Sequence, residues 1–530
     1  MAVVSVLPET LGKIPGTPNP VAWVSDKGGW INDLITDHKK ILVDIEKFQG
    51  YYDGDTWAIL SKQPKREDDP NNKIVPNYAA IIVDFAVNYM VGKPPKVTVD
   101  PPKTTGGEDT VDAAVLDEYR NALNAVLWSN NSDAVFRELA KQGGIAGQDV
   151  IIAWLDENGD INFDEFPANE CLPVYDMRGR LQLLIRYYTI ETMESGKPEE
   201  RTRVEVYDEK YISYYIQKGE SEFVLDDTEI DPETGLGNPV QHFTNGIPAA
   251  IFINKLPANA KKRLQRVGVS DLGGGVLTLL DEYAKILSGS ADRNDYFADP
   301  YLKMVGVDVN QEDVLLMRKA RAISTKTPAK EADIDFIGWD QKVDGVEKHA
   351  DRIKNTIYEV TCTPRLDNLT GATATEIKMK YAGLDIKVSE KEVYFAKAIY
   401  RLMEIVTDML NAKRLAENGV LDAERIVQII RGKDDAGNPV EPPITLFDAD
   451  WLTATFTRSL PQNYKEIVDM VIQLIDKVPD EELYSLLWFV EDPADVIDRM
   501  KQQRAARAKE VEDYMYNAGT EDDPAAAGTE

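Results

Sequence analysis

The sequence predicts a helix-rich α+β protein of several domains. The chain has 530 residues, which is more than one compact domain normally holds and indicates two to four domains. Apolar residues recur at helical spacing both before residue 147 and after residue 270. Between these parts, residues 150–254 show mostly alternating apolar and polar side chains, which is typical of strands. We therefore expect a β-containing region between two helical ones.

The first part of the chain is expected to be mainly helical. Residues 1–28 carry Pro, Gly and Thr with little periodicity, so we expect a mobile N-terminal arm. Residues 29–50 have one broad apolar face and predict a helix. After a turn-rich segment, a second helix is expected from Pro76 to the Gly-Lys-Pro-Pro sequence at Gly92, because Gly and Pro end helices.

Residues 111–147 predict further helix, with a break at Gly143-Gly144. The next residues predict a β-hairpin whose turn is centred on Asn158-Gly159. The alternating Asp and Asn residues of this turn imitate a calcium-binding loop. Such a loop needs Gly at its sixth position and Glu at its twelfth, where this chain has Ile161 and Pro167. The sequence therefore favours a plain hairpin over a calcium site.

Two helices are expected around a less regular insert. Ser270-Asp271 suits the N-cap of the first helix, which has an apolar stripe. Residues 299–343 predict shorter, mixed elements. Residues 345–360 predict the second helix, because apolar residues recur at steps of three and four, and this helix ends before Thr363-Pro364.

The longest helical pattern follows a polar loop. It runs from residue 374 to about residue 413 and predicts a helix on the order of 60 Å long, which Gly383 is expected to kink. Residues 450–458 then predict a strand, and residues 461–509 predict helix again. Residues 511–530 are acidic and rich in helix breakers, and we expect them to be disordered.

Composition limits the classes of function. The net charge of −31 favours solubility and argues against a protein that clamps DNA phosphates. It leaves open a protein through which DNA slides, because sliding needs weak attraction. No run of about 18 apolar residues predicts a membrane span. Two cysteines far apart in sequence, and the lack of a secretion signal, fit a reducing cytoplasm.

The sequence gives no positive case for an enzyme, and we expect no cofactor or metal. It has no G-x-S-x-G, no H-E-x-x-H and no Cys/His signature of nucleophilic catalysis. The glycine-rich stretch at Leu272–Val276 lacks the Lys-Ser/Thr of a phosphate-binding loop. A nuclease or hydrolase with dispersed carboxylates remains an alternative, since sequence alone cannot pair 91 acidic residues.

Two clusters of basic residues stand out against the acidic average. Each is explained either by a solvated face with local salt bridges or by contact with nucleic acid or an acidic partner. The first consists of Lys255, Lys261, Lys262, Arg263 and Arg266, and the second of Arg318, Lys319, Arg321, Lys326 and Lys330.

Several stretches, taken together in their order and spacing, resemble the portal proteins of tailed bacteriophages, notably those of long-tailed phages of Gram-positive bacteria. A paired Asn, a helix and then Tyr-x-x-Gly-Lys-Pro before a strand is one such pattern, and Ser-Asp-Leu before a long helix is another. One departure from the family pattern is the triple glycine at 273–275. The stretches are YYDGD at Tyr51–Asp55, then Asn71–Val97, Val269–Gly306, Val346–Leu366, Thr370–Glu392, Phe456–Val471 and Val490–Met500.

The resemblance implies a portal fold in which about twelve subunits form a ring at one capsid vertex. Each subunit is then divided into a wing, a stem of two helices, a clip between those helices, a tunnel loop and a crown. The implied bounds are 29–268 for the wing, 269–298 and 344–362 for the stem helices, 299–343 for the clip, 363–373 for the tunnel loop, 374–460 for the long kinked helix with the return to the wing, and 461–510 for the crown helices.

The resemblance also implies roles and partners. DNA passes through the ring during packaging and ejection, and the ring docks the large subunit of the terminase motor, a head-completion adaptor, the major capsid protein and the scaffolding protein. The location is the virion, after assembly in the host cytoplasm. The alternative is another structural capsid or tail-assembly protein without DNA passage. The tunnel loop would contribute Arg365, Asp367, Asn368, Leu369 and Thr370, and the second basic cluster would lie in the clip.

The channel chemistry follows from the physics of sliding. Each Lys or Arg contact with a phosphate adds affinity and therefore friction. The expected tunnel loop has one base and one acid among small polar residues, and the expected stem helices are acidic. Their acids are Asp281, Glu282, Asp292, Asp295, Asp344, Glu347, Asp351 and Glu359.

Overall fold

The computed structural model describes the chain in two compact units. The main unit contains residues 1–368 and 379–459, and the C-terminal unit contains residues 369–378 and 460–530. The described residues are 29–64, 67, 69–101, 111–156, 158–176, 178–194, 197–219, 222–226, 237–259, 266–298, 301–305, 312, 333–337, 343–365, 374–434, 436–458, 471–475, 477–485, 496–497, 499–505 and 507. The expected N-terminal arm and acidic tail lie outside them.

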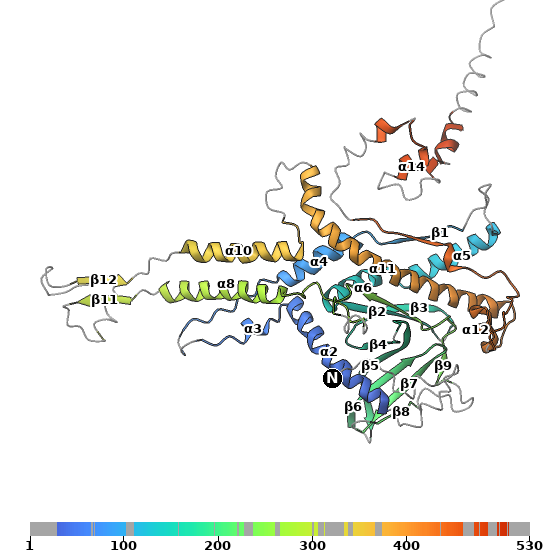
Figure 1. Cartoon of the computed structure of the whole chain (residues 1–530), viewed down its shortest axis with the longest axis horizontal. Helices are drawn as coiled ribbons and strands as arrows, with labels where there is room; N and C mark the ends of the chain where they lie inside the picture. Colours follow the sequence, from blue (N-terminus) through green and yellow to red (C-terminus); the bar gives the residue numbers. More distant parts are fainter. Residues whose placement is uncertain are drawn as a thin grey trace, which may run out of the picture. The chain divides into compact units, whose positions relative to one another are not determined.

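The main unit begins with three helices, α2 (Gly29–Asp53), α3 (Trp57–Leu60) and α4 (Tyr78–Val91) (Figure 1). The expected helix over 29–50 is confirmed and continues for three more residues. α4 begins after Asn77, whose side chain accepts a hydrogen bond from the backbone N–H of Ala80, and it ends at Gly92 as expected. The described residues 61–77 between α3 and α4 form no regular element.

The prediction of a helix break at Gly143-Gly144 is wrong. α5 (Ala113–Ser129) ends at Asn130, and α6 (Ser132–Ala146) starts after Asn131, which has a left-handed backbone with φ of 48°. Both glycines lie inside α6. A Cβ at position 143 would lie 2.3 Å from a ring carbon of Phe252. Close packing against a distant strand therefore requires a small residue there, whereas the sequence pattern suggested a helix end.

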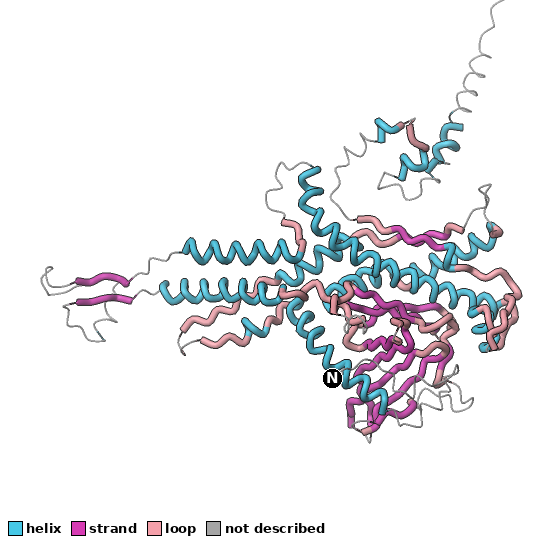
Figure 2. Tube along the Cα trace, in the orientation of Figure 1, coloured by secondary structure: helices cyan, strands magenta, loops and turns pink. Residues whose placement is uncertain are grey.

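The β region forms two antiparallel sheets, which Figure 2 shows gathered in one part of the main unit. The smaller sheet has the strand order β10-β2-β3, and the larger has the order β4-β5-β6-β7-β8 with β9 paired to β7. Another strand pair, β1-β13, joins residues early and late in the chain. The strands are β1 (Lys96–Val99), β2 (Gln148–Leu155), β3 (Ile161–Phe166), β4 (Cys171–Tyr175), β5 (Leu181–Glu194), β6 (Lys197–Tyr207), β7 (Tyr211–Lys218), β8 (Glu222–Leu225), β9 (Val240–Gln241), β10 (Ala249–Ile253) and β13 (Leu452–Thr455).

The hairpin centred on Asn158-Gly159 is confirmed as the connection between β2 and β3. Its turn is held by Asp156, whose carboxylate accepts hydrogen bonds from the backbone N–H groups of Asn158 and Asp160 at 2.9 and 2.8 Å. These hydrogen bonds lower the pKa of the Asp156 carboxyl. The carboxylate of Asp156 therefore stabilises the turn.

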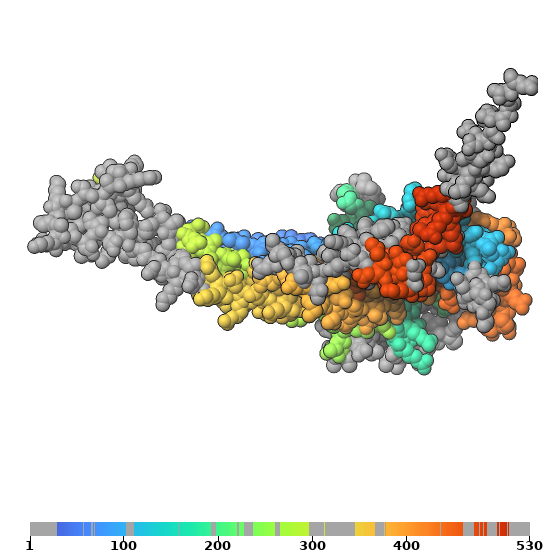
Figure 3. All heavy atoms as spheres, turned by 90° about the horizontal axis from the view of Figure 1, so that it is seen from above, coloured from blue at the N-terminus to red at the C-terminus, as the bar shows by residue number. Residues whose placement is uncertain are grey.

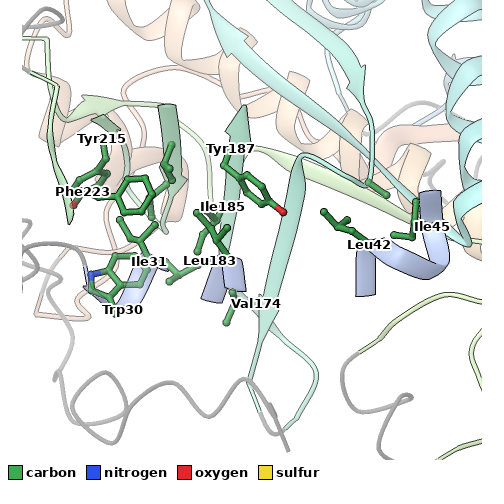
Figure 4. Packing of buried hydrophobic residues seen from close by; sticks show 14 of the residues in the cluster. Trp30, Ile31, Leu42, Ile45, Val174, Leu183, Ile185, Tyr187, Tyr215 and Phe223 are labelled. Atoms are coloured by element: carbon green, nitrogen blue, oxygen red, sulfur yellow. The ribbon is translucent and has the colours of Figure 1, made fainter. Parts of the chain in front are cut away.

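α2 packs against one face of the larger sheet, and apolar side chains of the helix and the sheet form a shared hydrophobic core. Its apolar residues, which include Ile31 and Leu42, pack against Leu183, Ile185 and other inward side chains of the strands (Figure 4). His38 lies in the same layer and hydrogen-bonds the hydroxyl of Tyr187 at 2.8 Å. Burial lowers the pKa of His38 to about 4, so this histidine is neutral at physiological pH.

The smaller sheet contains a buried acidic pair. Asp149 on β2 is fully buried next to Glu165 on β3. Burial and, secondly, the charge of Glu165 raise the pKa of Asp149 well above its usual range, and burial also raises the pKa of Glu165. On the adjacent helix α6, the charge of Glu138 raises the pKa of Glu165 further, and the charge of Lys141 opposes this. The folded chain therefore favours a protonated carboxyl at this site.

We expect Asp149→Asn to flatten the dependence of stability on pH. The folded chain keeps the proton of Asp149 at pH values where the unfolded chain releases it. The free energy of unfolding is therefore highest below the ordinary carboxyl pKa and falls as pH rises through the raised folded-state pKa. Urea unfolding across mildly acidic to mildly alkaline pH measures this slope. Asp164→Asn, at an exposed position on β3, is the control, and parallel curves for Asp149→Asn and the unchanged chain would contradict the prediction.

The second half of the main unit contains two helices that extend from the β region. α8 (Val276–Ala298) and α10 (Val343–Thr361) pack side by side, and the strands β11 (Tyr301–Val305) and β12 (Asp333–Ile337) pair between them in sequence (Figures 1 and 2). The second expected helix and its end before Thr363 are confirmed. The first starts at Val276, because left-handed Gly274 and Gly275 place a turn between Ser270 and the helix.

The long helix α11 (Ala374–Glu417) is confirmed and extends beyond its expected end near residue 413. It is unbroken through Gly383, and Figure 1 shows the helix bent in its first part, so its 44 residues follow a path of about 65 Å at 1.5 Å per residue. α12 (Ala423–Arg431) packs against its last turns, and the short 3-10 helix η2 (Ala449–Trp451) leads into β13. In the C-terminal unit the structure describes α14 (Asp480–Ser485) and short helical pieces near residue 500. None of the helices in the described ranges combines the length and the apolarity needed to cross a bilayer.

Candidate functional site

The residues that the sequence singled out fall mostly outside the described part of the chain. Arg318, Lys319, Arg321, Lys326 and Lys330 lie there, as do Asp367, Asn368, Leu369 and Thr370. The candidate site therefore consists of the helices α8 and α10, which flank these segments. It also includes the junction that joins this helix pair to the rest of the main unit.

Arg365 is the one described residue of the expected tunnel loop among those singled out. It follows α10 directly and is exposed. Its guanidinium donates a hydrogen bond to the side-chain oxygen of Asn355 and lies 5.9 Å from the centre of the Tyr358 ring. Because both partners lie on α10, the start of the loop is fixed to the helix that precedes it.

The acidic face of α8 is covered by a segment of the same chain. We call residues 54–77 the strap. Asp292 accepts a hydrogen bond from the backbone N–H of Asn72 at 2.6 Å and forms an ion pair with Lys62. Asp295 accepts a hydrogen bond from the side-chain amide of Asn72 at 2.6 Å. Figure 3 shows the blue atoms of this part of the chain lying along the green and yellow atoms of α8 and α10. Two of the acids that were expected near a channel thus hold the strap.

Other contacts continue the same attachment. The hydroxyl of Tyr51 donates a hydrogen bond to Asp281 at 2.7 Å, and the backbone N–H of Ile74 donates one to the hydroxyl of Ser288 at 3.0 Å. Although burial alone would raise the pKa of Asp292, its bonds to Lys62 and Asn72 hold that pKa below the usual range. Asp292 is therefore ionised at neutral pH.

The exposed acids of the pair belong chiefly to α10. Glu347, Asp351 and Glu359 are exposed, and across the pair Glu282 on α8 lies 4.0 Å from the imidazole of His349. Asp344 lies in α10, and its side chain is outside the described ones. The carboxylates of α10 thus differ from Asp281, Asp292 and Asp295, since those three contact other parts of the chain.

An aromatic cluster joins the helix pair to α4. The ring of Tyr78 lies edge-on to Tyr283 of α8 and Tyr358 of α10, with ring centres 5.5 and 5.8 Å apart. Edge-to-face pairs of this kind stabilise packing beyond the area they bury. α4 therefore fixes the spacing of the two helices near the junction.

The junction itself contains a buried ion network. The carboxylate of Asp271, 3% exposed, pairs with Lys391 of α11, 7% exposed, and with Lys387 at 3.3 Å. Burial alone would raise the pKa of Asp271, but the two ammonium groups hold it below the usual range. Burial lowers the pKa of Lys391, and Asp271 opposes that shift. The sequence presented Asp271 as a helix cap, and only the fold brings it to two lysines of α11.

Hydrogen bonds extend this network to the ends of three further elements. The backbone N–H of Asp271 donates to the carbonyl oxygen of Gly144 at 2.9 Å, and the side-chain amide of Asn254 donates to the carbonyl oxygen of Val269 at 2.9 Å. Lys387 also donates to the carbonyl oxygen of Thr361 at the end of α10. The ends of α6, β10 and α10 are thus tied to α11 around one carboxylate.

Two glycines allow the chain to enter this junction. The backbone at Gly268 runs against the turn at Gly147, and a Cβ on Gly268 would lie 1.7 Å from the carbonyl oxygen of Gly147. Gly147 itself has φ of 93°, which favours glycine. The sequence shows a glycine at each of the two positions. No neighbouring residue indicates that the two glycines contact each other.

The arrangement is a pair of packed helices held at one end by an ion network and hydrogen bonds. Among the residues that the structure describes, no group of three or more His, Cys, Asp or Glu side chains is placed to hold a metal ion. The described cysteines, Cys171 and Cys362, are free thiols. What the geometry offers is two long helices, rigidly attached at one end and joined by a segment with paired strands at the other.

Comparison with known proteins gives this architecture a family. A family model described as "Phage portal protein, SPP1 Gp6-like" matches residues 31–510. The portal protein of Bacillus phage SPP1 is 25% identical over 489 residues, which cover 91% of this chain and 85% of that protein. Since the family match extends over most of the sequence, the chain belongs to the SPP1 Gp6-like family of phage portal proteins.

Proposed function

We propose that about twelve copies of this chain form a ring at one vertex of a phage capsid, and that double-stranded DNA passes through the ring during packaging and ejection. The family match over residues 31–510 carries the proposal. Portal proteins are structural, capsid-associated and oligomeric. The firmly attached pair α8 and α10 supports it further, because a channel wall made of repeated subunits needs a rigid element from each copy.

The parts of the subunit are proposed as follows. α8 and α10 are the stem, the segment between them is the clip, and the segment that follows α10 is the tunnel loop. The β region with its covering helices is the wing. In residue numbers the wing is 29–268, the stem 269–298 and 344–362, the clip 299–343, the tunnel loop 363–373, the long helix with the return to the wing 374–460, and the crown 461–510.

A channel for sliding DNA should bind phosphates weakly, because each cationic contact adds affinity. Glu347, Asp351 and Glu359 on α10 are exposed carboxylates that repel phosphates. The guanidinium of Arg365 contacts Asn355 and Tyr358, which reduces its freedom to hold a phosphate. With Asp367 close in sequence, the tunnel loop would guide DNA with little friction.

The partners are proposed from the same assignment. The clip would meet the terminase large subunit during packaging and the head-completion adaptor afterwards, and the wing would meet the major capsid and scaffolding proteins. ATP hydrolysis would belong to the motor and not to this chain. The protein would reside in the virion after assembly in the host cytoplasm.

Removing three cations from the clip is expected to weaken docking. Arg318→Ala, Lys319→Ala and Arg321→Ala together should lower the affinity for the motor or the adaptor roughly ten-fold or more, because charged contacts at an interface contribute to both association rate and affinity. Surface plasmon resonance with the purified partners measures this. Lys39→Ala, Lys40→Ala and Lys47→Ala on α2 remove the same charge elsewhere. Equal docking by both variants would show that the clip cluster is not the contact.

Electron microscopy of the purified full chain tests the proposal as a whole. The expected image is a turbine-shaped ring with an axial hole. Solid assemblies without a hole would support the alternative, a capsid or tail-assembly protein that DNA never crosses.

A further inference from the structure

The wing contains a pocket whose charge is opposite to that of the chain. Its volume is about 280 Å³, and it lies beside the β4–β5 turn, β10 and α11. Apolar side chains such as Leu181 and Ile251 form much of its lining, and the charged groups of the lining are all cations. These cations are Arg180, Arg266, Lys397 and Arg401.

Two of the cations are held in place by the fold. Arg401 donates hydrogen bonds to the carbonyl oxygens of Asn245 and Ile247, each at 3.1 Å, and pairs with Glu404 at 2.8 Å. The guanidinium of Arg266 lies 5.5 Å from the centre of the Tyr175 ring. A Cβ at Gly179 would lie 2.5 Å from its Nη2 atom. A glycine in the β4–β5 turn therefore leaves the space that this guanidinium occupies.

The other two cations are available. Arg180 and Lys397 are exposed, and the charge of Asp176, in the same turn as Arg180, attracts the guanidinium of Arg180. The lining contains no Asp or Glu, although the chain as a whole carries 91 acidic residues against 60 basic ones. A concave cationic site of this kind attracts anions.

The apolar lining identifies the class of anion. Phosphates of a DNA duplex are bound by protruding cations, and buried aliphatic side chains contribute nothing to that binding. A peptide segment with both acidic and apolar side chains uses the cations and the lining together. The surface beside the pocket supports this choice: on the same face of α11 as Lys397, Val393 is 68% and Tyr400 38% exposed.

We propose that this pocket binds an acidic segment of a second copy of the chain and is one side of the contact between neighbouring subunits. The inference rests on the proposed ring. Neighbouring subunits in a ring meet through two different surfaces. A cationic pocket that lies in this contact therefore faces a different surface of the neighbouring copy, and that surface has to be acidic. Each copy has a net charge of −31, so copies repel one another unless such a site lies at their contact.

The test compares assembly of two full-length variants that carry the same net charge. Arg180→Glu with Lys397→Glu reverses both available cations of the pocket. Lys39→Glu with Lys47→Glu does the same on the exposed face of α2. We expect the pocket variant to need a protein concentration roughly ten-fold higher or more to assemble, measured by native mass spectrometry, and the α2 variant to assemble like the unchanged chain. If the pocket variant does not fold, Arg180→Ala with Lys397→Ala replaces it and is expected to shift assembly in the same direction.

Cross-linking identifies the occupant. A carbodiimide reagent joins Lys397 to a nearby carboxylate, and assemblies mixed from light and ¹⁵N-labelled copies show whether the two lie on different copies. Assembly by the pocket variant equal to that of the unchanged chain would overturn the inference, as would cross-links of Lys397 within one copy only. A loss of DNA binding with assembly unchanged would also overturn it and assign the pocket to nucleic acid. If the unchanged chain forms no ring at all, the proposed function fails together with the inference.

Discussion

Asp271→Ala lowers the free energy of unfolding of the main unit by about 3–5 kcal/mol, which is the usual cost of removing one partner of a buried ion pair. The substitution leaves the ammonium group of Lys391 buried without its counter-charge, and it removes the bond from Asn254 as well. We expect α8 and α10 to lose their fixed attachment to α11 and to the β region. Urea unfolding monitored by circular dichroism measures the change.

Glu390→Ala is the matched control for Asp271→Ala. Glu390 pairs with Lys255 at 2.9 Å, but the two side chains are 51% and 54% exposed. Solvent screens such a pair, so its loss should cost less than about 1 kcal/mol. A loss of stability in Asp271→Ala no larger than in Glu390→Ala would show that the junction does not depend on this carboxylate.

The pH dependence gives Asp271→Ala a second signature. Because the folded-state pKa of Asp271 is lowered, the carboxylate contributes stability above its ordinary pKa, and this contribution is lost as pH falls through the folded-state value. The difference between the unchanged chain and Asp271→Ala should therefore shrink in strong acid. A difference that stays constant down to low pH would mean that the loss is one of packing and not of charge.

Gly268→Ala destabilises the chain by about 3 kcal/mol, at the upper end of the range for added atoms in a packed site. Its Cβ would lie 1.7 Å from the carbonyl oxygen of Gly147, and backbone atoms on both sides have little freedom to move apart. Thermal unfolding followed by calorimetry measures the effect.

Gly289→Ala is the control for Gly268→Ala. No atom lies within 4 Å of a Cβ at position 289, which is inside α8, so alanine is expected to stabilise that helix by about 0.5–1 kcal/mol. The same Gly→Ala change should thus lower the free energy of unfolding at position 268 and raise it at position 289. A Gly268→Ala protein as stable as the unchanged chain would show that the two backbones can separate.

Local patterns in the sequence predicted most of the elements correctly. The helix over 29–50, the turn at Asn158-Gly159 and the end of α10 each depend on residues close in sequence. The break expected at Gly143-Gly144 was wrong because Phe252, more than a hundred positions away, leaves no room for a Cβ at position 143. A glycine that meets a distant side chain has the same local signature as a helix end.

The site was harder to predict from the sequence than the helices and strands were. Asp271 and Lys391 are 120 positions apart, and neither carries a local signal that it will be buried. The cationic pocket gathers its charges from three separate stretches, and of its four cations only Arg266 belonged to a basic cluster in the sequence. The assignments of the tunnel loop and the clip cluster stay predictions, since most of their residues lie outside the described part of the chain.

The strap also bears on how this protein can change over evolutionary time. Asn72 and Asp295 are 223 positions apart, yet a substitution of either removes the side-chain hydrogen bond between them. Lys62 and Asp292 form a second such pair in the same attachment, so we expect each pair to change together. In an alignment of related chains the members of each pair should covary, and that covariation would link the strap to α8 without any structure.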